Sequence, residues 1–197
     1  MISVKDKIVF ITGASSGIGE SCGKIFAQSG AQLILAARRQ EKLEKLAEEL
    51  TEKFTTKVYL LKLDVRDRLA VESAINSLPE PWKDIDILIN NAGLSRGLNK
   101  LHIGDFKDWE EMIDTNIKGL LYMTRYIVPE MVSRGRGHVV NIGSIAGRGA
   151  YPGGNLVFFC VTRSPHVNIS ELLVVPRDQA NATMVHRHNT IKIGEEN

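Results

Sequence analysis

One glycine pattern limits the fold of this chain more than any other feature. Residues 12–19 read Thr-Gly-x3-Gly-x-Gly, directly after the apolar run 8–11 and directly before the helix-like stretch 20–29. A strand, a glycine turn and a helix in this order form a phosphate-binding element, because N–H groups of the first helical turn face an anion there. The flanking strand and helix are the context that such a motif requires. The alternative is a glycine-rich surface turn.

Each glycine of the pattern has its own expected role. Gly13 lets the chain turn sharply off the strand, and Gly17 lets the backbone approach a pyrophosphate without an intervening Cβ. Gly19 is expected to let the helix pack closely on the sheet.

Composition predicts one soluble domain with a sizeable core. The chain has 197 residues, of which 43% are apolar and 24% charged. A net charge of +2 is too small to indicate a nucleic-acid or membrane partner. Two cysteines, Cys22 and Cys160, favour a reducing compartment, and with no signal peptide or bilayer-spanning segment expected, we predict a cytoplasmic location. We expect no metal site, since His186 and His188 have no further ligands around them.

Apolar runs and helical periodicities alternate along the chain. Strands are expected at residues 8–11, 31–37, 57–63, 85–89 and 137–142, and helices between them, the last of these over residues 106–132. Strands separated by helices give right-handed crossovers and a parallel sheet. The pattern predicts the α/β class and a doubly wound, Rossmann-like sheet, with no domain boundary before about residue 155.

Polar residues follow several of the expected strands. Asp64 ends the third, Asn90 and Asn91 end the fourth, and Asn141 and Ser144 belong to the end of the fifth. In open α/β sheets the ligand lies beyond the carboxyl ends of the strands. Each of these residues alone could be a turn residue or a helix cap, but together they indicate a ligand site.

With these motifs, residues 4–156 resemble the short-chain dehydrogenases/reductases. The shared marks are the glycine turn, Asp64-Val65, residues 90–93 (Asn-Asn-Ala-Gly), Asn116 and Ser144. Residues 84–88 and 114–120 are similar to the branch of NADP-dependent 3-hydroxy acid dehydrogenases. The resemblance implies hydride transfer between a nicotinamide and a small 3-hydroxy acid, or a related secondary alcohol or ketone. It also implies a small-molecule substrate and homo-oligomers among family members, although the state of this chain stays open.

The resemblance also assigns the parts of the cofactor site. It implies that Gly13, Ser15, Ser16, Gly17, Ile18 and Gly19 bind the pyrophosphate, that Asp64 and Val65 flank the adenine, and that Asn91, Ala92 and Gly93 lie at the nicotinamide ribose.

Two arginines after the second strand favour NADP over NAD. A dinucleotide site normally has an acid there for the ribose 2′-hydroxyl, or an arginine for a 2′-phosphate. Arg38 and Arg39 offer two guanidiniums and no acid, and a guanidinium binds phosphate bidentately. The alternative is that both only begin a charged surface helix.

The catalytic half of the family pattern is present only in part. Ser144 matches the family serine that hydrogen-bonds the substrate oxygen, and Asn116 matches the family's proton-relay asparagine. The family's general acid/base is a tyrosine followed four residues later by a lysine, which lowers the tyrosine pKa. None of the four tyrosines here is followed by such a lysine. Residues 159–163 imitate the spacing with phenylalanine and arginine, which cannot replace this pair.

An internal deletion after Leu156 would explain this absence. Residues 157–175 resemble a later part of the same family, where a penultimate helix ends and the last strand begins. We therefore expect a nucleotide-binding domain at 1–156 and a late segment of the same domain at 157–197, with a disordered end and a possible edge strand at 172–175. A merely divergent tail is the alternative. Two functions stay open: an NADP-dependent oxidoreductase, or an inactive isoform that binds cofactor or pairs with other subunits.

Overall fold

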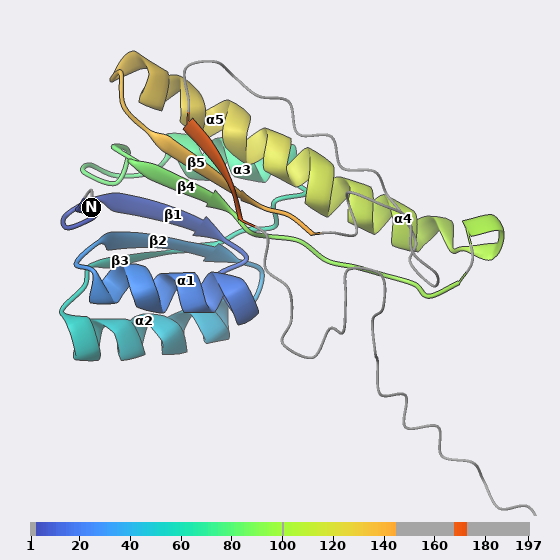
Figure 1. The fold of residues 1–197 in the computed structure, drawn as a ribbon, viewed down its shortest axis with the longest axis horizontal. Helices are drawn as coiled ribbons and strands as arrows, with labels where there is room; N and C mark the ends of the chain where they lie inside the picture. Colours follow the sequence, from blue (N-terminus) through green and yellow to red (C-terminus); the bar gives the residue numbers. More distant parts are fainter. Residues whose placement is uncertain (1–2, 100, 145–167, 173–197) are drawn as a thin grey trace, which may run out of the picture.

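The computed structural model describes residues 3–99, 101–144 and 168–172, and these form one parallel sheet covered by helices on both faces (Figure 1). The sheet has six strands in the order β3-β2-β1-β4-β5-β6, and every neighbouring pair is parallel. This is the order of a Rossmann-like, doubly wound sheet, so the predicted fold is confirmed. The strand order reverses between β1 and β4, where such sheets bind their ligands.

The elements follow the predicted alternation closely. The strands are β1 (Ile8–Thr12), β2 (Gln32–Ala37), β3 (Val58–Lys62), β4 (Ile87–Asn90), β5 (His138–Ile142) and β6 (Asn168–Leu172). The α-helices are α1 (Gly17–Gln28), α2 (Gln40–Phe54), α3 (Arg68–Asn76), α4 (Phe106–Ile113) and α5 (Leu120–Ser133). A short 3-10 turn, Leu101–Ile103, precedes α4. Strand β4 begins at Ile87, two residues later than expected. Ile85 precedes the strand but is still buried in the core.

Alternation within β1 divides the core into two layers. Ile8 and Phe10 belong to the layer that α3 and α5 cover, and Val9 and Ile11 belong to the layer that α1 and α2 cover. Figure 1 shows these two helix pairs on opposite faces of the sheet. Because both faces are covered, all five residues of β1 are buried.

The helix predicted over residues 106–132 is interrupted in the structure. The backbone widens into a π-helix at Asp114–Gly119, between α4 and α5. At its end, a Cβ on Gly119 would lie 2.6 Å from Cγ2 of Val65, so the helix passes close to the chain beyond β3. Short π-helical segments often mark functional sites, and this one carries Asn116.

A late strand does pair beside β5, but earlier in the sequence than expected. Strand β6 pairs with β5 from His138 opposite Asn168 to Ile142 opposite Leu172. The apolar run 172–175 had suggested the strand, whereas backbone pairing with the five residues of β5 sets its observed bounds. Residues 173–175 lie outside the described part of the chain.

Candidate functional site

The candidate site lies where the carboxyl ends of β1 and β4 meet. Thr12, the last residue of β1, is buried, and its Oγ1 accepts hydrogen bonds from the backbone N–H groups of Asn91 and Ala92, both at 2.9 Å. The same hydroxyl donates to the carbonyl oxygen of Ile89 at 3.3 Å. Thr12 therefore fastens the start of the glycine turn to the chain that leaves β4.

The side chain of Asn91 also connects the chain after β4 to the glycine turn. Its Nδ2 donates to the carbonyl oxygens of Thr12 at 2.9 Å and Gly13 at 3.2 Å. The Asn91 side chain thus supports the turn, while the role predicted for it toward a ribose stays a prediction.

The glycines of the turn are required by the observed backbone. Gly13 and Gly17 have φ values of 65° and 58°, in the left-handed region that favours glycine. A Cβ on Gly13 would lie 2.9 Å from Cα of Ala92, whereas one on Gly17 would meet nothing within 4 Å. The backbone at Gly17 is therefore open to a ligand.

Gly19 is close-packed for a reason that differs from the prediction. A Cβ there would overlap Asn91 Nδ2 and lie 2.5 Å from the carbonyl oxygen of Gly13. The close approach is to the turn and to the chain after β4, and not to the face of a strand.

A guanidinium already lies at the turn. Arg39 Nη2 donates to Ser16 Oγ at 2.7 Å and to Ser15 Oγ at 3.0 Å, and its Nε donates to Ser15 Oγ at 3.2 Å. Ser16 precedes α1 without capping it through its side chain, so the N–H groups of the first turn keep their capacity to bind an anion. Ile18, in the first turn of α1, is 40% exposed. Hydroxyls, N–H groups and a positive charge therefore gather where the sequence predicted a pyrophosphate.

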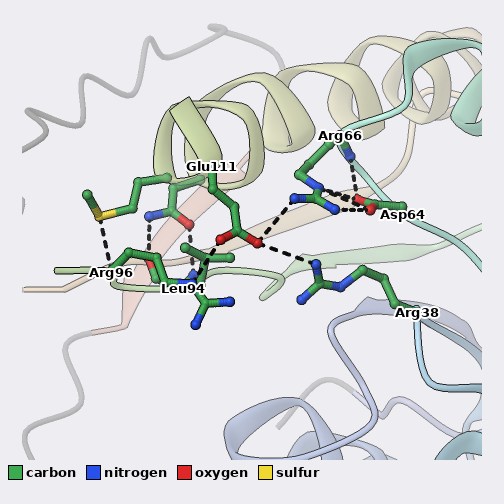
Figure 2. A network of polar contacts seen from close by, with 8 residues as sticks. Arg38, Asp64, Arg66, Leu94, Arg96 and Glu111 are labelled. Carbon is green, nitrogen blue, oxygen red and sulfur yellow. Dashed lines mark hydrogen bonds and ion pairs between the residues drawn. The ribbon is translucent and has the colours of Figure 1, made fainter. Parts of the chain in front are cut away.

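Arg38 points elsewhere, toward a second charged cluster (Figure 2). Its Nη1 lies 3.7 Å from Oε1 of Glu111, a residue of α4. Arg66 and Arg96 also pair with Glu111, at 3.2 Å and 2.8 Å. The two neighbouring arginines, which the sequence treated alike, thus lie in different surroundings, and neither only begins a surface helix.

Asp64 is held by Arg66. The Arg66 side chain donates to both carboxylate oxygens at 2.6–3.0 Å, and its backbone N–H donates to Oδ1 at 3.1 Å. Burial alone would raise the pKa of Asp64, but the hydrogen bonds and the charge of Arg66 lower it below the ordinary 3.8. Val65 is buried and packs in the core.

Asn116 fixes the chain beyond Gly93. Its Oδ1 accepts from the backbone N–H of Leu94 at 2.9 Å, and its Nδ2 donates to the Leu94 carbonyl oxygen at 2.8 Å. A Cβ on Gly93 would lie 3.4 Å from the same Oδ1. Both ends of the amide are therefore engaged with backbone, in an arrangement that holds the β4–α4 connection on the π-helix.

Ser144 is exposed just beyond β5. The ends of β4 and β5 are joined by Asn90, whose Nδ2 donates to Asn141 Oδ1 at 2.9 Å and to Thr124 Oγ1 at 3.1 Å. Tyr151 and the imitating stretch 159–163 lie outside the described residues.

Sequence reasoning missed several residues that shape the site. Thr12 stood in the motif without an assigned role, although a threonine at the end of a buried strand was a usable signal. Glu111, Arg66 and Arg96 gave no signal, because their pairing joins residues 15 to 45 positions apart.

The described residues contain neither a membrane-crossing helix nor a group of metal-binding side chains. None of their helices is long and apolar enough to cross a membrane. They also contain no group of three or more His, Cys, Asp or Glu residues that could hold a metal ion.

Comparisons with known proteins agree with this geometry. The curated NADP-dependent 3-hydroxy acid dehydrogenase YdfG of Salmonella typhi is 50% identical over 149 residues, 76% of this chain and 58% of that protein. The crystal structure of serine dehydrogenase from Escherichia coli has a TM-score of 0.71 and 50% identity, covering 76% of this chain and 67% of that one. A closed form of serine dehydrogenase complexed with NADP+ has a TM-score of 0.70 and 49% identity, covering 76% and 58%.

The family profile described as short chain dehydrogenase matches residues 7–156. The chain spans less than two thirds of the curated YdfG protein that it matches. The profile nevertheless covers every strand from β1 to β5 and all the candidate site residues. This chain belongs to the short chain dehydrogenase family.

Proposed function

We propose that this chain binds NADP as the nucleotide-binding part of an oxidoreductase that acts on a small 3-hydroxy acid or a related secondary alcohol or ketone. One observation carries the proposal: Arg39 donates to the hydroxyls of Ser15 and Ser16 on a turn that Thr12 and Asn91 hold in place. The names of the relatives, which specify NADP and 3-hydroxy acids, supply the reaction class.

The residues present fit a dinucleotide. Gly17 has no atom within 4 Å of where its Cβ would be, so a pyrophosphate could approach the backbone, and Gly13, Ile18 and Gly19 complete the turn. Asp64 and Val65 would lie at the adenine, and Asn91, Ala92 and Gly93 at the nicotinamide ribose. When bound, the nicotinamide supplies or accepts a hydride. Ser144 would hydrogen-bond the substrate oxygen, and Asn116 would position the backbone beside it.

NADP is preferred over NAD because the charges after β2 are positive. Arg38 is half exposed and Arg39 contacts the serine hydroxyls of the phosphate turn, so a 2′-phosphate would meet two guanidiniums. Competition titrations with NADPH and NADH test this. We expect tighter binding of NADPH, and a smaller preference in Arg38→Asp. Arg68→Asp, an equal change of charge on α3, is the control and should leave the preference unaltered. Equal affinities in the parent chain would overturn the NADP assignment.

A second candidate is that the chain binds the cofactor without catalysis. It rests on one observation: no tyrosine among the 197 residues is followed four positions later by lysine. We propose that residues 1–156 are the nucleotide-binding domain and that 157–197 is a late segment of it, joined by a deletion that removed the helix with this pair. Sequencing the transcript across the codons for Leu156 and Val157 tests the deletion. A longer transcript that encodes Tyr-x-x-x-Lys at this point would support the deletion. A gene in which the codons for Leu156 and Val157 are adjacent, with no longer transcript, would contradict it.

A further inference from the structure

Glu111 forms ion pairs with arginines from three separate segments of the chain. Its Oε2 lies 2.8 Å from Nε of Arg96 on the chain after β4, and its Oε1 lies 3.2 Å from Nη1 of Arg66 on the chain after β3. The same Oε1 lies 3.7 Å from Nη1 of Arg38, which follows β2. Figure 2 shows the carboxylate between these side chains. Its side chain is 20% exposed, so water screens it only in part.

The three contacts are unequal. Arg96 and Arg66 donate hydrogen bonds to Glu111, and Arg66 is further fixed by Asp64. Arg38 is beyond hydrogen-bonding distance and 51% exposed. Glu111 therefore does not orient the Arg38 guanidinium and acts on it mainly through charge.

The surroundings of Glu111 favour its ionised form. The hydrogen bond from Arg96 lowers the pKa of this carboxyl, and the charges of Arg96, Arg66 and Arg38 lower it further, although burial acts in the opposite direction. The carboxylate stays ionised at neutral pH.

We propose that Glu111 is a specificity-determining residue whose carboxylate competes with the 2′-phosphate of NADP for Arg38 and so weakens the discrimination between NADP and NAD. The inference rests on the proposed binding of NADP by this chain. A phosphomonoester carries about −1.5 to −2 charges at pH 7, so a carboxylate already beside Arg38 repels it and offsets part of the attraction. A dinucleotide with a free 2′-hydroxyl has no charge there and is indifferent to Glu111.

Glu111→Gln tests this with little change of shape. Glutamine removes the negative charge and keeps one side-chain oxygen, which can accept from Arg96 or from Arg66 but not from both, because the two arginines bind different carboxylate oxygens. Glu110→Gln is the matched control, since Glu110 is exposed on the same helix and forms no ion pair with any described arginine. Urea unfolding of each variant shows whether the fold is retained.

Affinities are measured by calorimetry with two matched pairs of probes. NADPH and NADH report on the whole cofactor, and adenosine 2′,5′-bisphosphate and adenosine 5′-monophosphate report on the adenosine end alone. We expect Glu111→Gln to tighten both 2′-phosphorylated probes by about three- to ten-fold at low salt, with a smaller gain at high salt. The probes without a 2′-phosphate, and the control variant, should change by less than about two-fold. In an Arg38→Gln background the gain should disappear.

The outcomes separate the two claims. Unchanged or weaker binding of the 2′-phosphorylated probes to Glu111→Gln, in a parent chain that binds NADPH, overturns the inference alone. Absence of binding of all four probes to both parent and variant overturns the proposed function and the inference with it. A gain that persists in the Arg38→Gln background also overturns the competition for Arg38.

Discussion

Thr12 should contribute more to stability than its size suggests. Replacing it with valine keeps the shape but removes the hydroxyl that accepts from the N–H groups of Asn91 and Ala92 and donates to Ile89. An unsatisfied buried donor costs about 1–3 kcal/mol, and a lost hydrogen bond about 0.5–1.5 kcal/mol. Asn91 and Ala92 are only partly buried, so the lower part of the range applies to each.

We therefore expect Thr12→Val to lower the free energy of unfolding by about 2–4 kcal/mol. For a chain of this size the melting temperature should fall by about 2–4 °C for each kcal/mol. Since typical domains have about 5–15 kcal/mol of stability, the variant should still fold.

Urea unfolding followed by tryptophan fluorescence measures the loss. Thr12→Ser is the control, because it keeps the hydroxyl and removes one buried methyl group, at a cost of about 1 kcal/mol. A Thr12→Val protein as stable as the parent, or more stable than Thr12→Ser, would show that the hydroxyl does not hold the two strand ends together.

Two further predictions concern the segment between β3 and α3. The pKa of Asp64 is lowered in the folded state, so its contribution to stability is complete above the ordinary 3.8 and is lost as the pH falls through the lower folded value. When the free energy of unfolding is measured as the pH is lowered, Asp64→Asn should lose less stability than the parent. An identical loss of stability with falling pH in the two proteins would contradict this. Asp67 caps α3 by accepting from the N–H of Ala70 at 3.0 Å. Asp67→Ala should lower the unfolding free energy by about 1 kcal/mol and Asp67→Asn by much less; equal losses would rule out the cap.

Much of the fold could be predicted because its signals are local. The buried run of β1 and the glycine pattern after it follow from adjacent residues, and a parallel sheet follows from their alternation with helices. The π-helix at Asp114–Gly119 could not be predicted, since apolar spacing continues through it. The bounds of β6 depend on pairing with β5, far away in the sequence.

The candidate site divides in the same way. The motif residues Gly13 and Asn91 were identifiable by type and spacing, and the structure brings them together. The surroundings of Arg38 could not be predicted, because its partner Glu111 lies on α4, which approaches Arg38 only in the folded chain. Charge clusters formed by long-range contacts leave no period or motif in the sequence.

The central proposal to test is that this chain binds NADP but lacks the tyrosine, followed four positions later by lysine, that the family resemblance implies as proton donor. Purified protein, free of host dehydrogenases, should be mixed with NADPH or NADP and with serine, allo-threonine or other 3-hydroxy acids or their ketones, and followed by the absorbance of the reduced nicotinamide. General acid/base catalysis is worth about 10²–10⁴-fold, so the account predicts binding of NADPH without measurable turnover. Turnover at a rate ordinary for the family, abolished by Ser144→Ala, would contradict it and show that another residue supplies the proton.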